Sequence, residues 1–188
     1  MDENKLFACA FRDDAAGIED AIRAGADPNA LHPRGGHPPL QVAAQQGSIR
    51  ALGALLAGGA NPNLRFTWVS RVDGRVFPGR VALMYAASDA VVKRLVSAGA
   101  ALEAHDQSGW TPVACAIEAI CVAAFRALLG AGARTDVTVM LNETPASLLD
   151  LVEAKAARIS KLAGTQLNPR AAQAIECLEE MRSTLMSK

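Results

Sequence analysis

The side chains that could carry nucleophilic, redox or metal chemistry are few and widely spaced in this chain of 188 residues. Its four cysteines are Cys9, Cys115, Cys121 and Cys177, and no two of them have the C-x-x-C spacing of zinc and redox motifs. Free cysteines are commonly buried as small apolar residues. We therefore expect structural thiols, without a metal site or a disulfide framework.

The histidines do not form a catalytic pattern either. His32, His37 and His105 fall in predicted loops, where we expect polar, solvent-facing side chains. Asp106 follows His105 but suits a turn, because its carboxylate can accept hydrogen bonds from nearby backbone N–H groups. No glycine-rich phosphate loop, His-Glu-x-x-His pair or nucleophile elbow occurs in the sequence. We expect no catalytic residue, no cofactor and no metal.

Composition and charge favour a folded protein without a nucleic-acid or membrane partner. Hydrophobic residues make up 51% of the chain, charged residues 20%, and there are 38 alanines, which suits closely packed helices. Nineteen basic residues balance nineteen acidic ones, so no net field attracts polyanions. Apolar runs are too short to span a bilayer, and the N-terminus is acidic, unlike a signal peptide. We expect a cytoplasmic protein.

The elements that must position any site follow a repeat of about 33 residues. A Gly-Ala dipeptide recurs in steps of 34, 40 and 33 residues, each time after a helix-like apolar pattern. A second short helical pattern lies upstream of most of them. The dipeptides are Gly25-Ala26, Gly59-Ala60, Gly99-Ala100 and Gly132-Ala133.

Local signals support pairs of short helices. The glycine of each dipeptide can close a helix in the left-handed conformation. Pro39, Pro112 and Pro145 suit the first helical turn, where an N–H has no partner, and Thr111 and Thr144 can cap the helices that follow. One such pair cannot bury its own apolar face, so consecutive pairs must stack.

These motifs resemble the ankyrin repeat. The best match runs from Gly109-Trp110-Thr111-Pro112-Val113 to Leu128-Leu129 and Gly132-Ala133. The resemblance implies an all-α solenoid of about five helix-turn-helix units in a single domain. The expected units span residues 3–30, 31–64, 76–103, 104–136 and 137–188.

The sequence also departs from the family pattern. The signature histidine is replaced by Gln41, Met84 and Ala114, which predicts weaker bracing between neighbouring loops. Between Ala87 and Leu95 the chain advances 95 − 87 = 8 residues, whereas between Ala44 and Leu55 it advances 55 − 44 = 11. The third unit should therefore have a clipped helix or turn.

Two segments are longer than the family pattern. Residues 65–78 contain Asp73-Gly74 between β-prone residues, which predicts a β-hairpin insertion. At the C-terminus, helices over 146–162 and 169–186 form an enlarged helical cap, since terminal repeats must cover the last apolar surface. A docking role for these two helices is the alternative.

The family resemblance implies a protein-binding surface made of finger loops and a palm of inner helices. The tryptophans Trp68 and Trp110 either contact a partner or brace the hairpin, and Arg80 could lie over Trp110 in a cation–π contact. Arginines at 65, 71, 75 and 80 suggest a partner with an acidic patch, or simply a solvated hairpin. The candidate contact residues are Trp68, Arg71, Arg75, Phe77, Arg80, Trp110, His37, Gln45, Gln46, Asp89 and Glu118.

We therefore expect a non-enzymatic protein–protein interaction module. It could act as an inhibitor or an immunity-type neutraliser of a cognate bacterial protein. An adaptor or oligomerisation scaffold is the alternative, followed by an enzyme with an unrecognised site. The sequence leaves the partner, the organism and the oligomeric state open.

Overall fold

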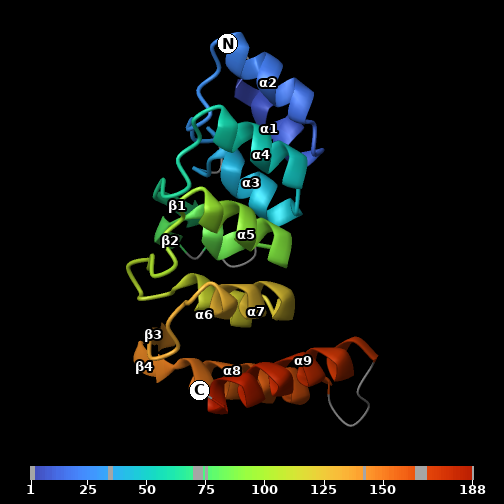
Figure 1. Cartoon of the computed structure of the whole chain (residues 1–188). Helices are drawn as coiled ribbons and strands as arrows, with labels where there is room; N and C mark the ends of the chain where they lie inside the picture. Colours follow the sequence, from blue (N-terminus) through green and yellow to red (C-terminus); the bar gives the residue numbers. More distant parts are fainter. Residues whose placement is uncertain are drawn as a thin grey trace.

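Pairs of helices stack one after another in chain order along the molecule (Figure 1). The computed structural model describes residues 3–33, 36–69, 74, 76–141, 143–163 and 169–187. The helices are α1 (Glu3–Phe11), α2 (Ala15–Arg23), α3 (Pro39–Gln46), α4 (Ile49–Ala57), the 3-10 turn η1 (Ala82–Tyr85), α5 (Asp89–Ser97), α6 (Pro112–Glu118), α7 (Val122–Gly130), α8 (Leu148–Ala163) and α9 (Pro169–Met186).

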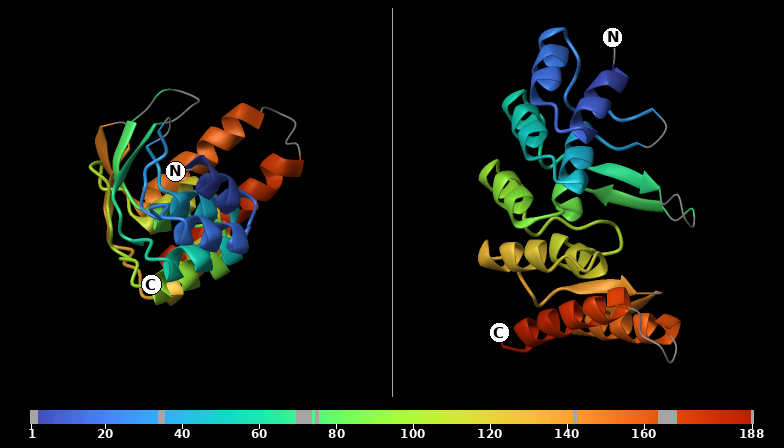
Figure 2. Two further views of the ribbon diagram at one scale, coloured as in Figure 1. Left: turned by 90° about the horizontal axis from the view of Figure 1, so that it is seen from above. Right: turned by 90° about the vertical axis from the view of Figure 1, so that its right-hand side faces the viewer.

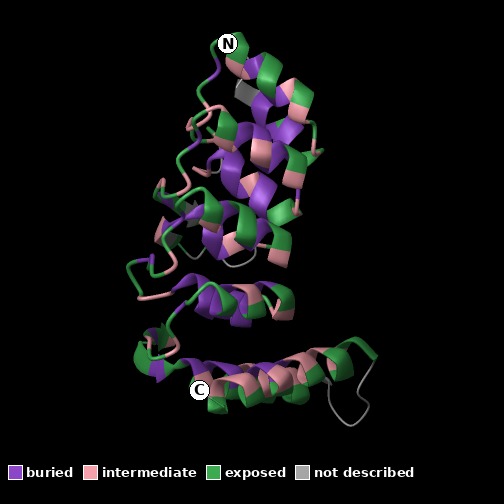
Figure 3. Ribbon diagram, in the orientation of Figure 1, coloured by how far each residue is buried: buried purple, intermediate pink, exposed green. Residues whose placement is uncertain are grey.

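The core lies between successive pairs rather than within any one of them. An inner row runs α1, α3, η1, α6 and α8, and an outer row runs α2, α4, α5 and α7, with contacts between consecutive members of each row. Both rows carry buried residues, which are purple in the ribbon of Figure 3. Fully buried alanines such as Ala43, Ala44 and Ala114 line these contacts, and their small side chains let the backbones approach closely. The helix-rich fold expected from the sequence is confirmed.

The predicted helix ends are confirmed at most positions. The glycines of all four Gly-Ala dipeptides have φ between 84° and 96°, which is left-handed and suits glycine. Pro39 and Pro112 lie in the first turns of α3 and α6. Thr111 caps α6, where its hydroxyl accepts a hydrogen bond from the N–H of Ala114 at 3.4 Å.

The predicted start of the first C-terminal helix, at Ala146 with Thr144 as its cap, is wrong. Thr144 and Pro145 belong to strand β4 (Thr144–Ser147), which pairs antiparallel with β3 (Thr138–Leu141). Helix α8 begins at Leu148 instead, where the Ser147 hydroxyl accepts from the N–H of Asp150 and the Asp150 carboxylate accepts from the N–H of Ser147. This reciprocal capping satisfies the first turn without Thr144.

A second strand pair precedes η1. Strand β1 (Phe66–Val69) pairs antiparallel with β2 (Val76–Arg80), with an irregularity between Phe66 and Trp68. Phe66 is buried and its ring lies 5.8 Å from that of Tyr85 in η1, which anchors the base of the pair. Both strand pairs project from the same side of the helix stack (Figure 2). Of the predicted turn at Asp73-Gly74, Asp73 lies outside the described residues.

The shortening expected in the third unit falls on its inner helix. In that position η1 makes one 3-10 turn of four residues, whereas α3 has eight and α6 has seven. The outer helix α5 keeps nine residues, as α4 and α7 do. The inner row is therefore thinnest at η1.

Two adjacent leucines of α4 test the stacking. Leu55 is fully buried, whereas Leu56 is half-buried at the edge of the interface. We expect Leu55→Ala to lower the free energy of unfolding by about 2–5 kcal/mol, because the cavity remains open between packed helices. Leu56→Ala should lower it clearly less. Urea denaturation followed by circular dichroism measures both, and equal losses would contradict the packing described here.

Candidate functional site

The finger loops are joined to one another by asparagine side chains. Asn29 donates from Nδ2 to the carbonyl of Gly59 at 3.1 Å, and its Oδ1 accepts from the N–H of Asn61 at 2.7 Å. One unit later Asn63 makes the same two bonds, to the Gly99 carbonyl and the Ala101 N–H, both at 2.8 Å. These bonds brace neighbouring loops although the family histidine is missing.

Sequence reasoning did not identify these asparagines. Their signal is the recurrence of Asp27-Pro28-Asn29 and Asn61-Pro62-Asn63 directly after the Gly-Ala stops. In both segments the first side chain accepts a hydrogen bond from the backbone N–H of the last residue, which fixes the loop locally. The expectation of weaker bracing rested on the absent histidine alone and overlooked this recurring tripeptide.

The strand pairs continue the linkage towards the C-terminus. Pro78 of β2 accepts a hydrogen bond from the N–H of Gln107 at 3.2 Å, and Ser108 accepts one from the N–H of Met140 in β3 at 3.0 Å. Gly109 has φ 77°, and a Cβ added there would lie 2.9 Å from the Thr138 carbonyl oxygen. Strands and loop thus form one connected edge of the molecule.

Arg80 was expected in an exposed basic cluster, but the structure buries it. It is only 8% exposed, and its Nε lies 2.9 Å from Oδ2 of Asp106, which is 3% exposed. The other carboxylate oxygen of Asp106 accepts from the N–H groups of Ser108 and Trp110 at 2.9 and 3.0 Å. Arg80 is therefore held inside the connected edge, and it is corrected from a contact residue to a structural one.

Trp110 makes bracing contacts to strands β2 and β3. It is half-buried, and its indole Nε1 donates to the Met140 carbonyl at 3.3 Å. The guanidinium carbon of Arg80 lies 5.9 Å from the indole ring centroid, which confirms the expected cation–π contact. Trp110 thus ties the finger loop to β3.

The hairpin residues are only partly described. Trp68 and Phe77 are paired across β1 and β2, but their side chains are outside the described part, as are Arg71 and Arg75 altogether. The described hairpin instead presents Val69 and Val76, which are 47% and 58% exposed. They are directly opposite one another in the antiparallel register, so both side chains project from the same face.

The predicted palm residues separate into two groups. Gln45 and Gln46 are exposed at the end of α3, as a palm requires. Glu118 instead forms an ion pair with Lys155 of α8 at 2.7 Å, which attaches α6 to the terminal helices. Asp89 is in the first turn of the outer helix α5 and pairs with Lys93 at 2.8 Å. Because η1 is so short, the chain has already entered the outer helix at Asp89.

The family of the chain is supported by a comparison with known protein families. The model described as Ankyrin repeat matches residues 35–65, which include α3, α4 and the loop after them. Residues 35–65 therefore match an ankyrin repeat. A search of curated proteins gave no match. The paired helices and left-handed glycines described above thus accompany a recognised repeat.

Two histidines before α3 were expected to face solvent but are half-buried. His32 and His37 stack in parallel, with ring centroids 5.1 Å apart and planes inclined by 2°. The buried Phe7 contacts both rings edge-on, at 4.8 and 6.0 Å. His37 therefore helps to attach the first finger loop to α1. His105, by contrast, is exposed.

No group of three or more His, Cys, Asp or Glu side chains that could hold a metal ion occurs among the described residues. Within the same residues, no helix has the length and apolar character needed to cross a membrane.

The Asp106–Arg80 pair predicts a stability effect. Asp106→Asn keeps an oxygen for the turn but removes the negative charge beside the buried Arg80 guanidinium, so we expect a loss of about 3–5 kcal/mol in the free energy of unfolding. Asp27→Asn is the matched control, because Asp27 caps the same kind of turn but is exposed and forms no described ion pair. Urea denaturation should show the control close to wild type. Similar losses in both variants would mean that the turn, not the ion pair, matters.

Cys115 predicts a pH dependence. Burial raises the pKa of its thiol to about 12, although Arg80 Nη1 lies 2.8 Å from its sulfur. In the unfolded chain the thiol ionises near pH 8.5. The raised pKa of the thiol therefore stabilises the folded state fully below about pH 8.5, and this stabilisation is lost as the pH rises towards 12. Between pH 9 and 11, the free energy of unfolding should fall by up to about 1.4 kcal/mol per pH unit more steeply in wild type than in Cys115→Ser. Parallel curves would refute this.

Proposed function

We propose that this protein binds a partner protein through the connected edge of finger loops and strands together with the palm at the end of α3. Ankyrin repeats are generally protein–protein interaction modules and are typically not enzymes. The proposal includes the five-unit division of the chain, with residues 65–78 as an insertion and α8 and α9 as an enlarged cap. The contact set is Val69, Val76, Gln45 and Gln46, with Trp68, Arg71, Arg75 and Phe77 retained as predictions.

The observation that carries the proposal is an exposed face built on loops that are already fixed. Hydrogen bonds link successive loops from Asn29 to β3, so the face loses little conformational entropy when it binds. On this face the hairpin exposes the valine pair Val69 and Val76. Exposed apolar residues side by side at the end of a strand pair suit a protein interface.

The finer functional assignments remain predictions. An acidic patch on the partner now rests on Arg71 and Arg75, because Arg80 is buried and Arg65 donates to the His105 carbonyl at 2.8 Å. A role as an inhibitor or immunity-type neutraliser would follow if binding blocks an activity of the partner. Bacterial origin and a cytoplasmic location also belong to this proposal.

The test compares two sets of substitutions from an exposed apolar residue to lysine. Val69→Lys/Val76→Lys alters the hairpin face, whereas Leu162→Lys alters a leucine that is 82% exposed at the end of α8. Each tagged variant is used to capture partners from a native lysate, and the affinity for the partner identified with wild type is then measured by titration calorimetry. We expect at least tenfold weaker binding for the hairpin variant, since apolar contacts at an interface contribute on the order of 1 kcal/mol or more each.

The control separates the two possible surfaces. Binding that survives in the hairpin variant but is lost in Leu162→Lys would assign the interface to the terminal helices and overturn the proposal. Capture of the chain's own copies alone would favour the oligomerisation scaffold instead. Unchanged binding in both variants would also reject the assigned face.

A further inference from the structure

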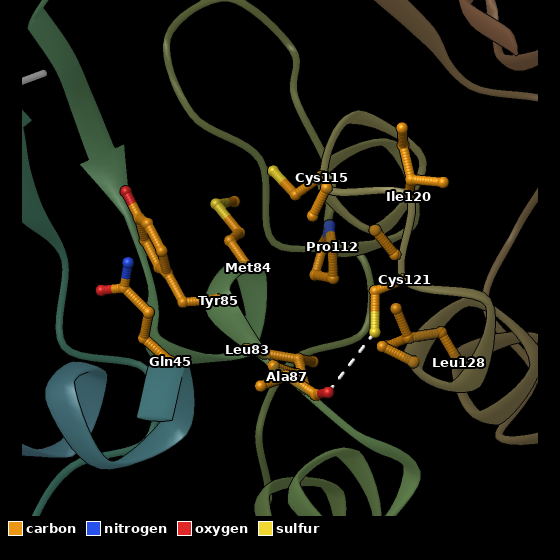
Figure 4. Close-up of a pocket in the computed structure, with 14 residues that line it drawn as sticks. Gln45, Leu83, Met84, Tyr85, Ala87, Pro112, Cys115, Ile120, Cys121 and Leu128 are labelled. Atoms are coloured by element: carbon orange, nitrogen blue, oxygen red, sulfur yellow. Dashed lines mark hydrogen bonds between the residues drawn. The ribbon is translucent and has the colours of Figure 1, made fainter. Parts of the chain in front are cut away.

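The short inner helix of the third unit leaves a pocket in the row. Because η1 makes a single turn between α3 and α6, the space that a longer helix would fill is a cavity of about 430 Å³. It is lined by η1 and the two alanines after it, by the facing side of α6, by the α6–α7 turn and by the start of α7 (Figure 4). Gln45 of the palm also lines it, so the pocket adjoins the proposed binding face.

The lining decides what the pocket can hold. None of its residues is charged, and it is formed mainly by alanines and larger apolar side chains such as Leu83, Met84 and Leu128. The thiol of Cys121 already donates to the Ala87 carbonyl at 3.5 Å. A charged occupant would lose its hydration without a counter-charge, which is costly in an apolar site. The pocket therefore selects an uncharged, apolar group.

The form of the pocket decides how that group must be supplied. The cavity is partly open to solvent rather than enclosed. Sites for free small molecules bury about 70–90% of the ligand's surface, which an open hollow does not achieve. A side chain that is tethered to a longer segment needs less enclosure, because the rest of that segment can contact the adjoining face. Anchors of this kind are typical of protein interfaces.

Ile120 at the pocket gives a second, independent indication. It lies in the turn between α6 and α7 with φ 54°, a conformation that is strained for a β-branched residue. The corresponding turns hold Asp13 (φ 57°) and Gly47 (φ 73°), residue types that tolerate it readily. The chain thus keeps a branched apolar side chain against the pocket at a position where it is conformationally unfavourable.

We propose that this pocket receives one apolar side chain, of the size of leucine, methionine or phenylalanine, from a segment of the partner protein. The inference rests on the proposed function and specifies its anchor. It also explains why the thinnest point of the inner row adjoins the palm: the missing helical turn is replaced on binding by a side chain of the partner.

The test uses a library of displayed dodecapeptides in which the central residue is fixed and the flanking positions are randomised. Separate pools carry central Leu, Met, Phe, Ser, Asp or Lys. On wild type we expect the three apolar pools to be enriched at least tenfold over the three polar ones. Affinities of the best apolar-centred peptides are then measured on variants.

Two alanines provide a matched pair of variants. Ala119 and Ala131 are both exposed, and both cap a helix C-terminus with nearly identical backbone angles, but only Ala119 lines the pocket. Ala119→Leu fills the pocket from its rim, so we expect about 30-fold weaker peptide binding, the size of a hot-spot loss. Ala131→Leu should bind as wild type does.

A third variant separates binding from folding. Ile120→Gly relieves the positive φ, which offsets part of the packing that is lost with the side chain. Its free energy of unfolding in urea should therefore stay within about 2 kcal/mol of wild type, so that it still folds, while it binds apolar-centred peptides more weakly. Equal enrichment of all pools on wild type, or full binding by Ala119→Leu, would overturn the pocket. If Ala119→Leu binds fully while Val69→Lys/Val76→Lys does not, the pocket is wrong but the proposed face stands. If both Ala119→Leu and Val69→Lys/Val76→Lys bind the partner as wild type does, the pocket and the proposed face are both rejected.

Discussion

The structure depends on one constraint: a pair of helices seven to nine residues long is too small to bury its own apolar face. Isolated helices of this length are marginal in water, so their stability comes from tertiary packing. Each pair buries its leucines, valines and alanines against the pairs before and after it. Alanine at the contacts lets the backbones approach, and the left-handed glycines end each outer helix so that the chain can return. Everything exposed on the loops is a consequence of this serial arrangement.

Local features could be predicted from the sequence because neighbouring residues determine them. A glycine at a helix end, a proline in a first turn and a threonine cap each act within four residues, and at Gly132, Pro112 and Thr111 the structure agrees. Thr144-Pro145 carries the same local signal as Thr111-Pro112 but forms a strand. There, the ladder with Thr138–Leu141 and the capping by Ser147 outweigh the local preference.

The candidate site was harder to predict because it depends on contacts between residues that are far apart in the sequence. The sequence around Arg80 suggests a surface residue, but in the structure Arg80 pairs with Asp106, which lies 26 positions later. Asp89 was assigned to the palm from its place after two alanines, but the shortened inner helix moves it to the outer row. Conversely, the asparagine bridges were visible as a recurring tripeptide, and they account for the fixed spacing of the loops. Exposure of Val69 and Val76 depends on a strand register that composition does not reveal.

The single turn of η1 has a consequence for how the array behaves as a cooperative unit. In a linear array, stability propagates through contacts between nearest neighbours, so the least extensive contact limits how far folding is coupled. At η1 the inner helix has half the length of α3, and the outer contact at the same junction, between α4 and α5, is less extensive than the contact between α2 and α4. By this reasoning we expect separate opening of the two halves to begin at the junction of α3 and α4 with η1 and α5. A ligand that spans this junction would join the two halves into a single cooperative block.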